Sequence, residues 1–281
     1  MSLRGAAATK QLQRENHRVL LYRRSHASLQ MEDRDMRNRK TIFRNAAAIM
    51  LSLVFILSSI SVAFSEDVDR IINDSMEAFK KVSDYTCRLD KKVYKNGTIY
   101  SDPDIFVKFK KPTHYYFRWD EGPFKGQEVI FVSGRHNDQI VAHPGGIFQF
   151  ITFHLDPIGN LAMKRNHHSL KESGMEKIMR IIENNYLLCK KTGLGKISYM
   201  GEDRIDGRDT WRIQGVFPKD DGFYAHKITL CFDKVLQLPV KITVCDESNR
   251  LIEEYIFRNL RINVGFKDRD FDPENPEYHF F

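Results

Sequence analysis

The segment EVIFVS, residues 128–133, places apolar side chains at successive positions and constrains the architecture more than any other stretch. Successive side chains of a strand point to opposite faces of its sheet, so Val129 and Phe131 share one face. Ile130 and Val132 share the other, and both faces must therefore be buried. Because only two long amphipathic helices are available to cover the sheet, we expect it to curl and to hold them inside or across its mouth.

Short strands separated by turn signals lie on both sides of this segment. Alternation with period two begins at Tyr85 and resumes after the Asn96-Gly97 turn, and HYYFRW at 114–119 leads to the central segment. About nine antiparallel strands are predicted in all. The others include 105–109, 139–143, 196–202, 210–217, 226–232, 239–246 and 251–260.

Two stretches show the three-and-four spacing of apolar residues that is typical of a helix packed on a core. The first covers residues 66–82. The second covers residues 169–191, and Ser169 with Glu172 forms a capping box at its start. Residues 148–165 are aromatic but are interrupted by turn residues, so the pattern assigns them neither helix nor strand.

These elements predict an α+β fold with one domain over residues 66–281, an antiparallel, curved, unclosed β-barrel with two main helices packed on or in its concave face. Such a sheet encloses an apolar cavity, although an ordinary filled core fits the same pattern equally well. Arg118 points to the opposite face, where it would anchor a lid or a lipid head group, or form a surface ion pair. Strand alternation predicts that the cavity is lined by Tyr115, Phe117, Trp119, Phe131, Trp211, Ile213, Ile228 and Leu230.

The N-terminal part of the chain has the organisation of an export signal. In residues 36–65 a basic run precedes the apolar stretch 46–63 and the small-x-small triplet Ala63-Phe64-Ser65, which is the order of a signal peptide. We therefore expect cleavage after this triplet and export to the periplasm of a Gram-negative type cell. The alternative is an uncleaved anchor that holds the protein at the inner membrane. Residues 1–35 lack apolar periodicity and are expected to be a non-structural extension.

The charge of the chain is concentrated in the same region. The whole chain has 44 Lys and Arg against 37 Asp and Glu, a formal net charge of +7. Residues 1–65 hold 11 basic and 4 acidic side chains, and residues 66–281 hold 33 of each. The expected exported domain is therefore neutral, and this argues against a nucleic-acid partner, which needs a basic face.

All four cysteines lie in the expected exported domain, where disulfides are permitted. A bridge between Cys231 and Cys245 is disfavoured, because the turn between their strands places Cys245 opposite Ala225 or His226. About five residues of strand, roughly 16 Å, would then separate the two cysteines. The other pairings with Cys87 and Cys189 stay open, as does the alternative of four buried free thiols.

No sequence motif of a catalytic centre is present. The chain lacks GxSxG, HExxH and GxGxxG patterns, which predicts a protein that is not an enzyme and needs no cofactor. Five histidines fall between residues 136 and 168 near Asp138 and Asp156, but their spacing matches no metal-ligand pattern, and no metal is predicted. These histidines are His136, His143, His154, His167 and His168.

A series of short motifs runs in one order along the domain: YTC at 85–87, VK at 107–108, GQEVIFV at 126–132, GR at 134–135, AH at 142–143, LDP at 155–157, LAM at 161–163 and FDPENPEY at 271–278. By these motifs the chain resembles the bacterial exported family catalogued as domain of unknown function 1571 (DUF1571). More loosely, Lys111-Pro112, Phe117-Arg118-Trp119 and the stretch from Val129 to Gly134 resemble the LolA-like superfamily of periplasmic lipoprotein carriers. The resemblance implies an unclosed β-barrel whose apolar concave face is covered by helices and holds acyl chains.

The sequence thus favours a periplasmic, non-enzymatic binding protein for a lipid, a lipoprotein acyl chain or another hydrophobic ligand. Its expected partners are this ligand or an acylated protein, with transient contact with a membrane and no nucleic acid. The alternative is an exported structural or interaction module with a filled core and no ligand.

Overall fold

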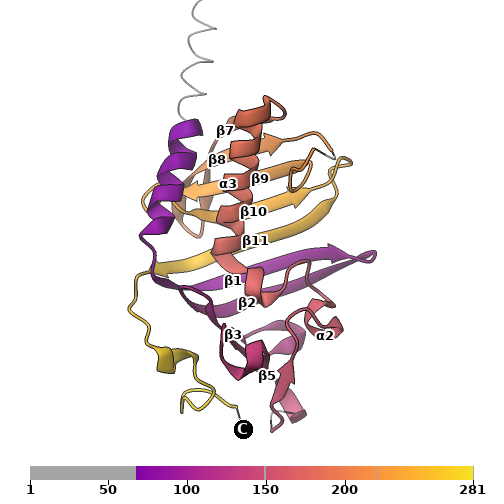
Figure 1. Cartoon of the computed structure of the whole chain (residues 1–281), viewed down its shortest axis with the longest axis vertical. Helices are drawn as coiled ribbons and strands as arrows, with labels where there is room; N and C mark the ends of the chain where they lie inside the picture. The colour runs from indigo at the N-terminus through magenta and orange to yellow at the C-terminus, as the bar shows by residue number, and fades with distance from the viewer. Residues whose placement is uncertain (1–67, 149, 220, 281) are drawn as a thin grey trace, which may run out of the picture. The chain divides into compact units, whose positions relative to one another are not determined.

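Eleven strands form one antiparallel sheet in the order β6-β5-β4-β3-β2-β1-β11-β10-β9-β8-β7 (Figure 1). Because β6 and β7 are its two edges, the sheet is open, as the sequence predicted. The strands are β1 (Asp84–Lys95), β2 (Thr98–Lys110), β3 (His114–Trp119), β4 (Glu128–Val132), β5 (Ile140–His143), β6 (Phe153–Leu155), β7 (Lys196–Ile205), β8 (Arg208–Val216), β9 (Lys227–Asp233), β10 (Pro239–Cys245) and β11 (Leu251–Ile262).

The computed structural model describes residues 68–148, 150–219 and 221–280. The expected extension 1–35 and signal peptide or anchor 36–65 lie outside these residues. Among the described residues, no helix is both long enough and apolar enough to span a membrane.

The helices pack on one face of the sheet. A helix over residues 68–80 and α3 (Gly174–Thr192) lie across the strands (Figure 1), and their apolar stripes join the larger core with Leu89, Phe117 and Leu230. A short helix, α2 (Asn160–Met163), lies near the β6 edge. Single turns of 3-10 helix are η1 (Gly122–Phe124), η2 (His136–Asp138), η3 (Gly146–Phe148), η4 (Leu170–Glu172) and η5 (Asp268–Phe271).

The outer face of β3, β4 and β5 is covered by the C-terminal tail. Ile130 and Val132 pack there with Phe271 and Tyr278 in a second, smaller core, whereas Val129 and Phe131 belong to the larger one. The two-sided burial of the EVIFVS segment is therefore as predicted. However, part of its cause is different, because curling and helices bury only the concave face and the tail buries the other.

The structure differs from the sequence prediction at the start of the second helix and adds elements in one segment that the prediction did not assign. The second helix begins at Gly174 and not at 169, and its N-cap Ser173 makes no side-chain capping bond. The reason is local, since Gly174 has a φ of +66°, which ends any helix running into it. In the segment 148–165, which the pattern left unassigned, the chain forms β6 and α2, and β6 helps to bring the strand number to eleven.

All four cysteines are free thiols. Cys245 faces Lys227 and Cys231 faces Lys241, so the disfavoured bridge is absent. The residue opposite Cys245 lies one or two positions beyond the expected one, because the register shifts between Pro239 and Lys241. Cys87 is fully buried, and burial raises the pKa of its thiol far above the usual range.

Candidate ligand cavities on the concave face

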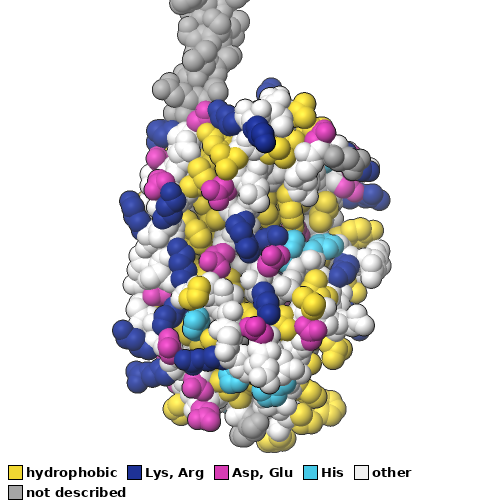
Figure 2. Space-filling model, viewed as in Figure 1, with side chains coloured by type: hydrophobic (Ala, Val, Ile, Leu, Met, Phe, Trp, Pro, Cys, Tyr) yellow, Lys and Arg dark blue, Asp and Glu magenta, His cyan; other side chains and the backbone are white. Residues whose placement is uncertain are grey.

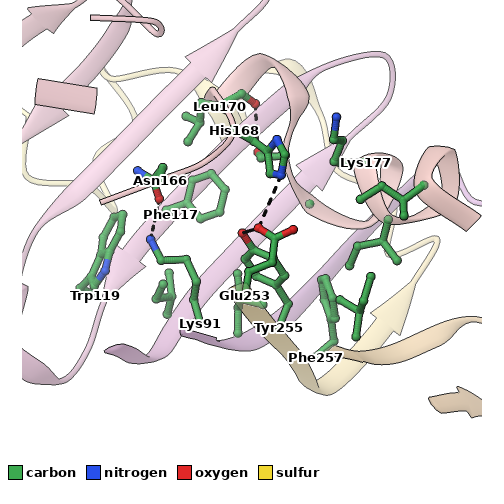
Figure 3. A pocket seen from close by; sticks show the side chains of 17 residues that line it. Lys91, Phe117, Trp119, Asn166, His168, Leu170, Lys177, Glu253, Tyr255 and Phe257 are labelled. Atoms are coloured by element: carbon green, nitrogen blue, oxygen red, sulfur yellow. Dashed lines mark hydrogen bonds and ion pairs between the residues drawn. The ribbon is translucent and has the colours of Figure 1, made fainter. Parts of the chain in front are cut away.

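An apolar inner cavity of about 110 Å³ lies between the start of α3 and the central strands (Figure 3). Its walls come from β1, β2, β3, β10, β11 and α3, because these elements turn their apolar side chains toward the same space. The apolar lining residues are Leu89, Ile105, Phe117, Trp119, Leu170, Ile178, Ile181, Ile242 and Phe257.

One polar cluster, centred on Glu253 of β11, interrupts this apolar wall. Glu253 is 1% exposed, and its carboxylate accepts hydrogen bonds from the Tyr255 hydroxyl at 3.0 Å and from the Tyr224 hydroxyl. His168 Nε2 lies 3.5 Å from the same carboxylate (Figure 3). Burial raises the pKa of Glu253, but the hydrogen bonds from His168 and Tyr224 outweigh it, so the pKa lies below the usual value. The wall thus holds a buried carboxylate that hydrogen bonds stabilise in its charged form.

A second polar cluster, around Lys91 of β1, marks the other end of the inner cavity. The Lys91 ammonium donates to Asn166 Oδ1 at 2.8 Å and pairs with Asp102 Oδ2 at 3.0 Å. Asp102 also pairs with Arg165 at 2.6 Å, so one buried carboxylate is shared by two cations. Burial lowers the pKa of Lys91, and the Asp102 charge opposes that change. These contacts fasten segment 165–170 over the sheet.

A larger outer cavity of about 590 Å³ adjoins the inner one toward the β6 edge. The two cavities share Lys91, Trp119, Asn166 and Leu170 as lining residues. The indole Nε1 of Trp119 is buried and has no hydrogen-bond partner among the residues that the structure describes, so a donor is free there at the boundary between the cavities. The apolar lining of the outer cavity is Phe124, Val129, Ile140, Ala142, Pro144, Phe153, Leu155, Leu161 and Ala162.

The structure divides the predicted lining residues among three places. Phe117 and Trp119 line the inner cavity, and Trp119 lines the outer one as well. Ile213, Ile228 and Leu230 line a separate cavity of about 30 Å³ beneath α3. They are apart from the first group because α3 crosses the concave face and fills the space between.

The other three predicted lining residues serve as packing. Tyr115 and Phe131 are fully buried in the larger core, and Tyr115 Oη donates to the carbonyl of Ser173 at 2.8 Å. Trp211 is covered by two cations, with the Arg70 guanidinium 5.7 Å and the Lys234 ammonium 5.9 Å from its ring centre. These side chains hold the helices on the sheet.

Arg118 lies on the outer face and cannot anchor a head group in the concave cavities. Its Nε atom pairs with Asp120 Oδ1 at 2.7 Å, and its guanidinium lies 5.2 Å from the centre of the Phe106 ring. Of the expected roles, the ion pair is the one its contacts support. Strand alternation is the physical reason, because Arg118 neighbours Phe117 and Trp119, which point inward.

Sequence reasoning missed the polar residues of the inner cavity and most of the outer cavity. His168 and Glu253 meet only through folding, and no local spacing signals their contact. The outer cavity depends on residues 153–166, where turn residues hide the β6 and α2 assignments. The sequence nevertheless contained a signal for the outer cavity. Phe153, Leu155 and Leu161 are apolar but do not follow the spacing of a core helix, which indicates a role other than helix packing.

The fold and the cavities place the protein in the class of open half-barrels that have an apolar cavity between the sheet and its helices. Within it, the chain belongs to the family described as "Protein of unknown function (DUF1571)", whose sequence model matches residues 82–280. The membership predicted from the short motifs is therefore confirmed. A comparison with curated protein sequences finds no match.

Among solved structures, the chain is similar to lipoprotein LppX of Mycobacterium tuberculosis, with 15% identity, coverage of 69% of this chain and 96% of that one, and a TM-score of 0.42. It is similar to a DUF1329 family protein from Desulfovibrio piger, with 13% identity, coverage of 74% and 97%, and a TM-score of 0.34. It is also similar to a LolA superfamily protein from Nitrosomonas europaea, with 11% identity, coverage of 73% and 96%, and a TM-score of 0.29.

Proposed function

We propose that the protein is an exported, non-enzymatic binding protein that holds a lipid, a lipoprotein acyl chain or another hydrophobic ligand in the two adjoining cavities. The observation that carries this proposal is that the apolar inner cavity adjoins a mostly apolar outer one, with Trp119 lining both. The outer cavity has a volume typical of small-molecule sites, which run from roughly 300 to 1,000 Å³. The alternative, an interaction module without a ligand, predicts that this space binds no lipid.

The energetics favour a chain of methylene groups as the ligand. Each methylene group moved from water to an apolar environment contributes about 0.8 kcal/mol, so a long acyl chain gains affinity without specific polar contacts. The free Trp119 indole N–H offers one donor to an ester or acid carbonyl oxygen at the boundary between the cavities. Lys91 and Arg165 share the single carboxylate of Asp102, so this part of the cavity lining keeps one excess positive charge. The cavities therefore suit an acyl chain whose polar end accepts a hydrogen bond.

Access to the outer cavity is framed by exposed apolar side chains. Leu161 and Phe153 line the cavity and are nevertheless 74% and 45% exposed. Ile147 and Ile158 in the same segment are 84% and 72% exposed. Figure 2 shows hydrophobic side chains gathered at the lower right of the viewed face, over the region of α2. We infer that this surface contacts a membrane transiently while a ligand enters or leaves.

The test is a binding measurement on protein purified from its native envelope fraction. Lipid extraction with mass spectrometry reads out the bound ligand, and titration with a dansyl-labelled fatty acid measures affinity. Trp119→Asp should weaken fatty-acid binding at least tenfold, because it places a charge at the boundary between the cavities. Val235→Asp is the matched control, since Val235 is 86% exposed in the turn after β9.

Two results would contradict the proposal. One is wild-type protein with neither co-purifying lipid nor affinity for the fatty acid, which would favour the filled-core module. The other is an equal loss of binding in Trp119→Asp and Val235→Asp with both variants folded by circular dichroism, which would place the ligand elsewhere.

A further inference from the structure

Glu128, His143 and His279 meet on the outer face of the sheet, away from the concave cavities. Glu128 on β4 and His143 at the end of β5 are direct partners in the antiparallel register. His279 reaches them from the C-terminal tail, which runs beside this end of the sheet (Figure 1). One ligand-type atom from each of the three side chains lies within 4.8 Å of the other two.

The carboxylate of Glu128 is buried without a lysine or arginine partner in the part of the chain that the structure describes. It is 1% exposed, and His279 donates to it from Nδ1 at 2.6 Å and from the backbone N–H at 3.3 Å. Arg118, its register partner on β3, is paired with Asp120 instead. A buried carboxylate is costly unless a cation compensates it, so the site calls for positive charge.

Two further observations point to a ligand in this place. His143 is 2% exposed, and its Nδ1 lies 2.6 Å from the carbonyl of Pro144, a contact in which Nδ1 must be the protonated nitrogen. This leaves the Nε2 lone pair free, which is how metal-bound histidines are usually held. In addition, the buried hydroxyl of Tyr116, whose ring stacks on Tyr278 at 4.1 Å, lies near Glu128 but makes no hydrogen bond of good geometry within the described part of the chain.

We propose that Glu128, His143 and His279 bind one divalent ion of the zinc type, which ties the C-terminal tail to the outer face of the sheet. Two imidazoles and one carboxylate are a common zinc ligand set that leaves the fourth position to water. Bonds of about 2.0–2.2 Å put tetrahedral ligand atoms about 3.4 Å apart, so a separation at the 4.8 Å limit must shorten by about 1.4 Å. His279, with a side chain that is 68% exposed, has room for this movement.

The experiment is a titration of chelator-treated full-length protein with Zn²⁺ by calorimetry, repeated with Co²⁺ followed by its visible absorption. We expect one ion per chain, an intense tetrahedral Co²⁺ spectrum and a higher melting temperature with the ion bound. His279→Ala and Glu128→Gln should each lower the affinity at least tenfold. His154→Ala is the matched control, because His154 is an exposed histidine on β6 outside the cluster, and it should bind as the wild type does.

The proposal is wrong if the wild type binds no stoichiometric Zn²⁺, or if binding survives His279→Ala unchanged. It is equally wrong if His154→Ala removes the ion. Glu128→Gln changes a buried residue, and this variant could fail to fold. In that case the His279→Ala variant decides the test, because His279 is exposed. The cavities of the proposed function lie on the other face, so the outcome is independent of that function.

Discussion

Gly174 shows how one residue holds α3 on the sheet. A Cβ atom at this position would lie 2.7 Å from Tyr85 Oη and 3.1 Å from the Tyr115 ring. Two hydrogen bonds require the start of α3 to lie this close to the tyrosines. The Met175 N–H donates to Tyr85 Oη at 3.2 Å, and Tyr115 Oη donates to the Ser173 carbonyl at 2.8 Å. With a φ of +66° as well, the position accepts only glycine without strain.

Gly174→Ala should therefore destabilise the protein more than Gly193→Ala at the other end of α3. Gly193 has a similar φ of +69°, but a Cβ atom there would meet no other atom within 4 Å, so alanine costs only the left-handed conformation, roughly 1–2 kcal/mol. At Gly174 the steric clash adds about 1–3 kcal/mol. Urea unfolding followed by tryptophan fluorescence measures both, and equal losses would mean that the two tyrosines do not constrain the helix.

At the scale of elements, Glu253 joins β11 to two segments that are distant in sequence. Its carboxylate receives Tyr224 from the 217–226 connection and faces His168 from the segment preceding α3. Asn185 of α3 accepts the Tyr224 backbone N–H at 3.0 Å, so the helix belongs to the same network. The ordering of the cavity wall thus depends on one ionised carboxylate.

Glu253→Gln should lower the free energy of unfolding at pH 7 by about 1–3 kcal/mol, because it breaks hydrogen bonds to a buried charged group. The folded-state pKa of Glu253 lies below the ordinary 4.5, so its contribution is present above pH 4.5 and is lost as the pH falls through the folded-state value. The difference between wild type and variant should thus shrink below about pH 4.5. Urea unfolding at pH 7 and pH 4 tests this, with the exposed Glu121→Gln as control. A difference that does not change with pH would contradict the role of the ionised carboxylate.

At the scale of the whole molecule, the exposed side chains of Ile147, Ile158 and Leu161 belong to the segment that we propose to contact a membrane. Changing Ile147, Ile158 and Leu161 together to Asp should reduce co-sedimentation with vesicles of phosphatidylethanolamine and phosphatidylglycerol at least tenfold, because apolar surface is replaced by charge. The control changes three exposed apolar residues elsewhere, Ile99, Val235 and Val264, to Asp. Equal sedimentation of the two triple variants would exclude this segment as the membrane contact.

Patterns within short stretches of the chain predicted most of the architecture. Period-two alternation placed Phe117 and Trp119 on the inner face and Arg118 on the outer one, and three-and-four spacing located both long helices. Such patterns depend on backbone geometry that repeats every few residues, so they can be detected without knowing the fold. They failed at Ser169 and Glu172, where a capping box is present in the sequence but the close approach at Gly174 moves the helix start.

The amino-acid sequence alone therefore specified an open antiparallel sheet buried on both faces, its two helices and its family. Folding in three dimensions added the division of the concave face into separate cavities by α3, the tail that covers the outer face, and the meetings of His168 with Glu253 and of Glu128 with His279. The physical reason is distance along the chain. Contacts between residues 85 or 151 positions apart are set by strand order and register summed over the whole sheet, and no local period contains that information.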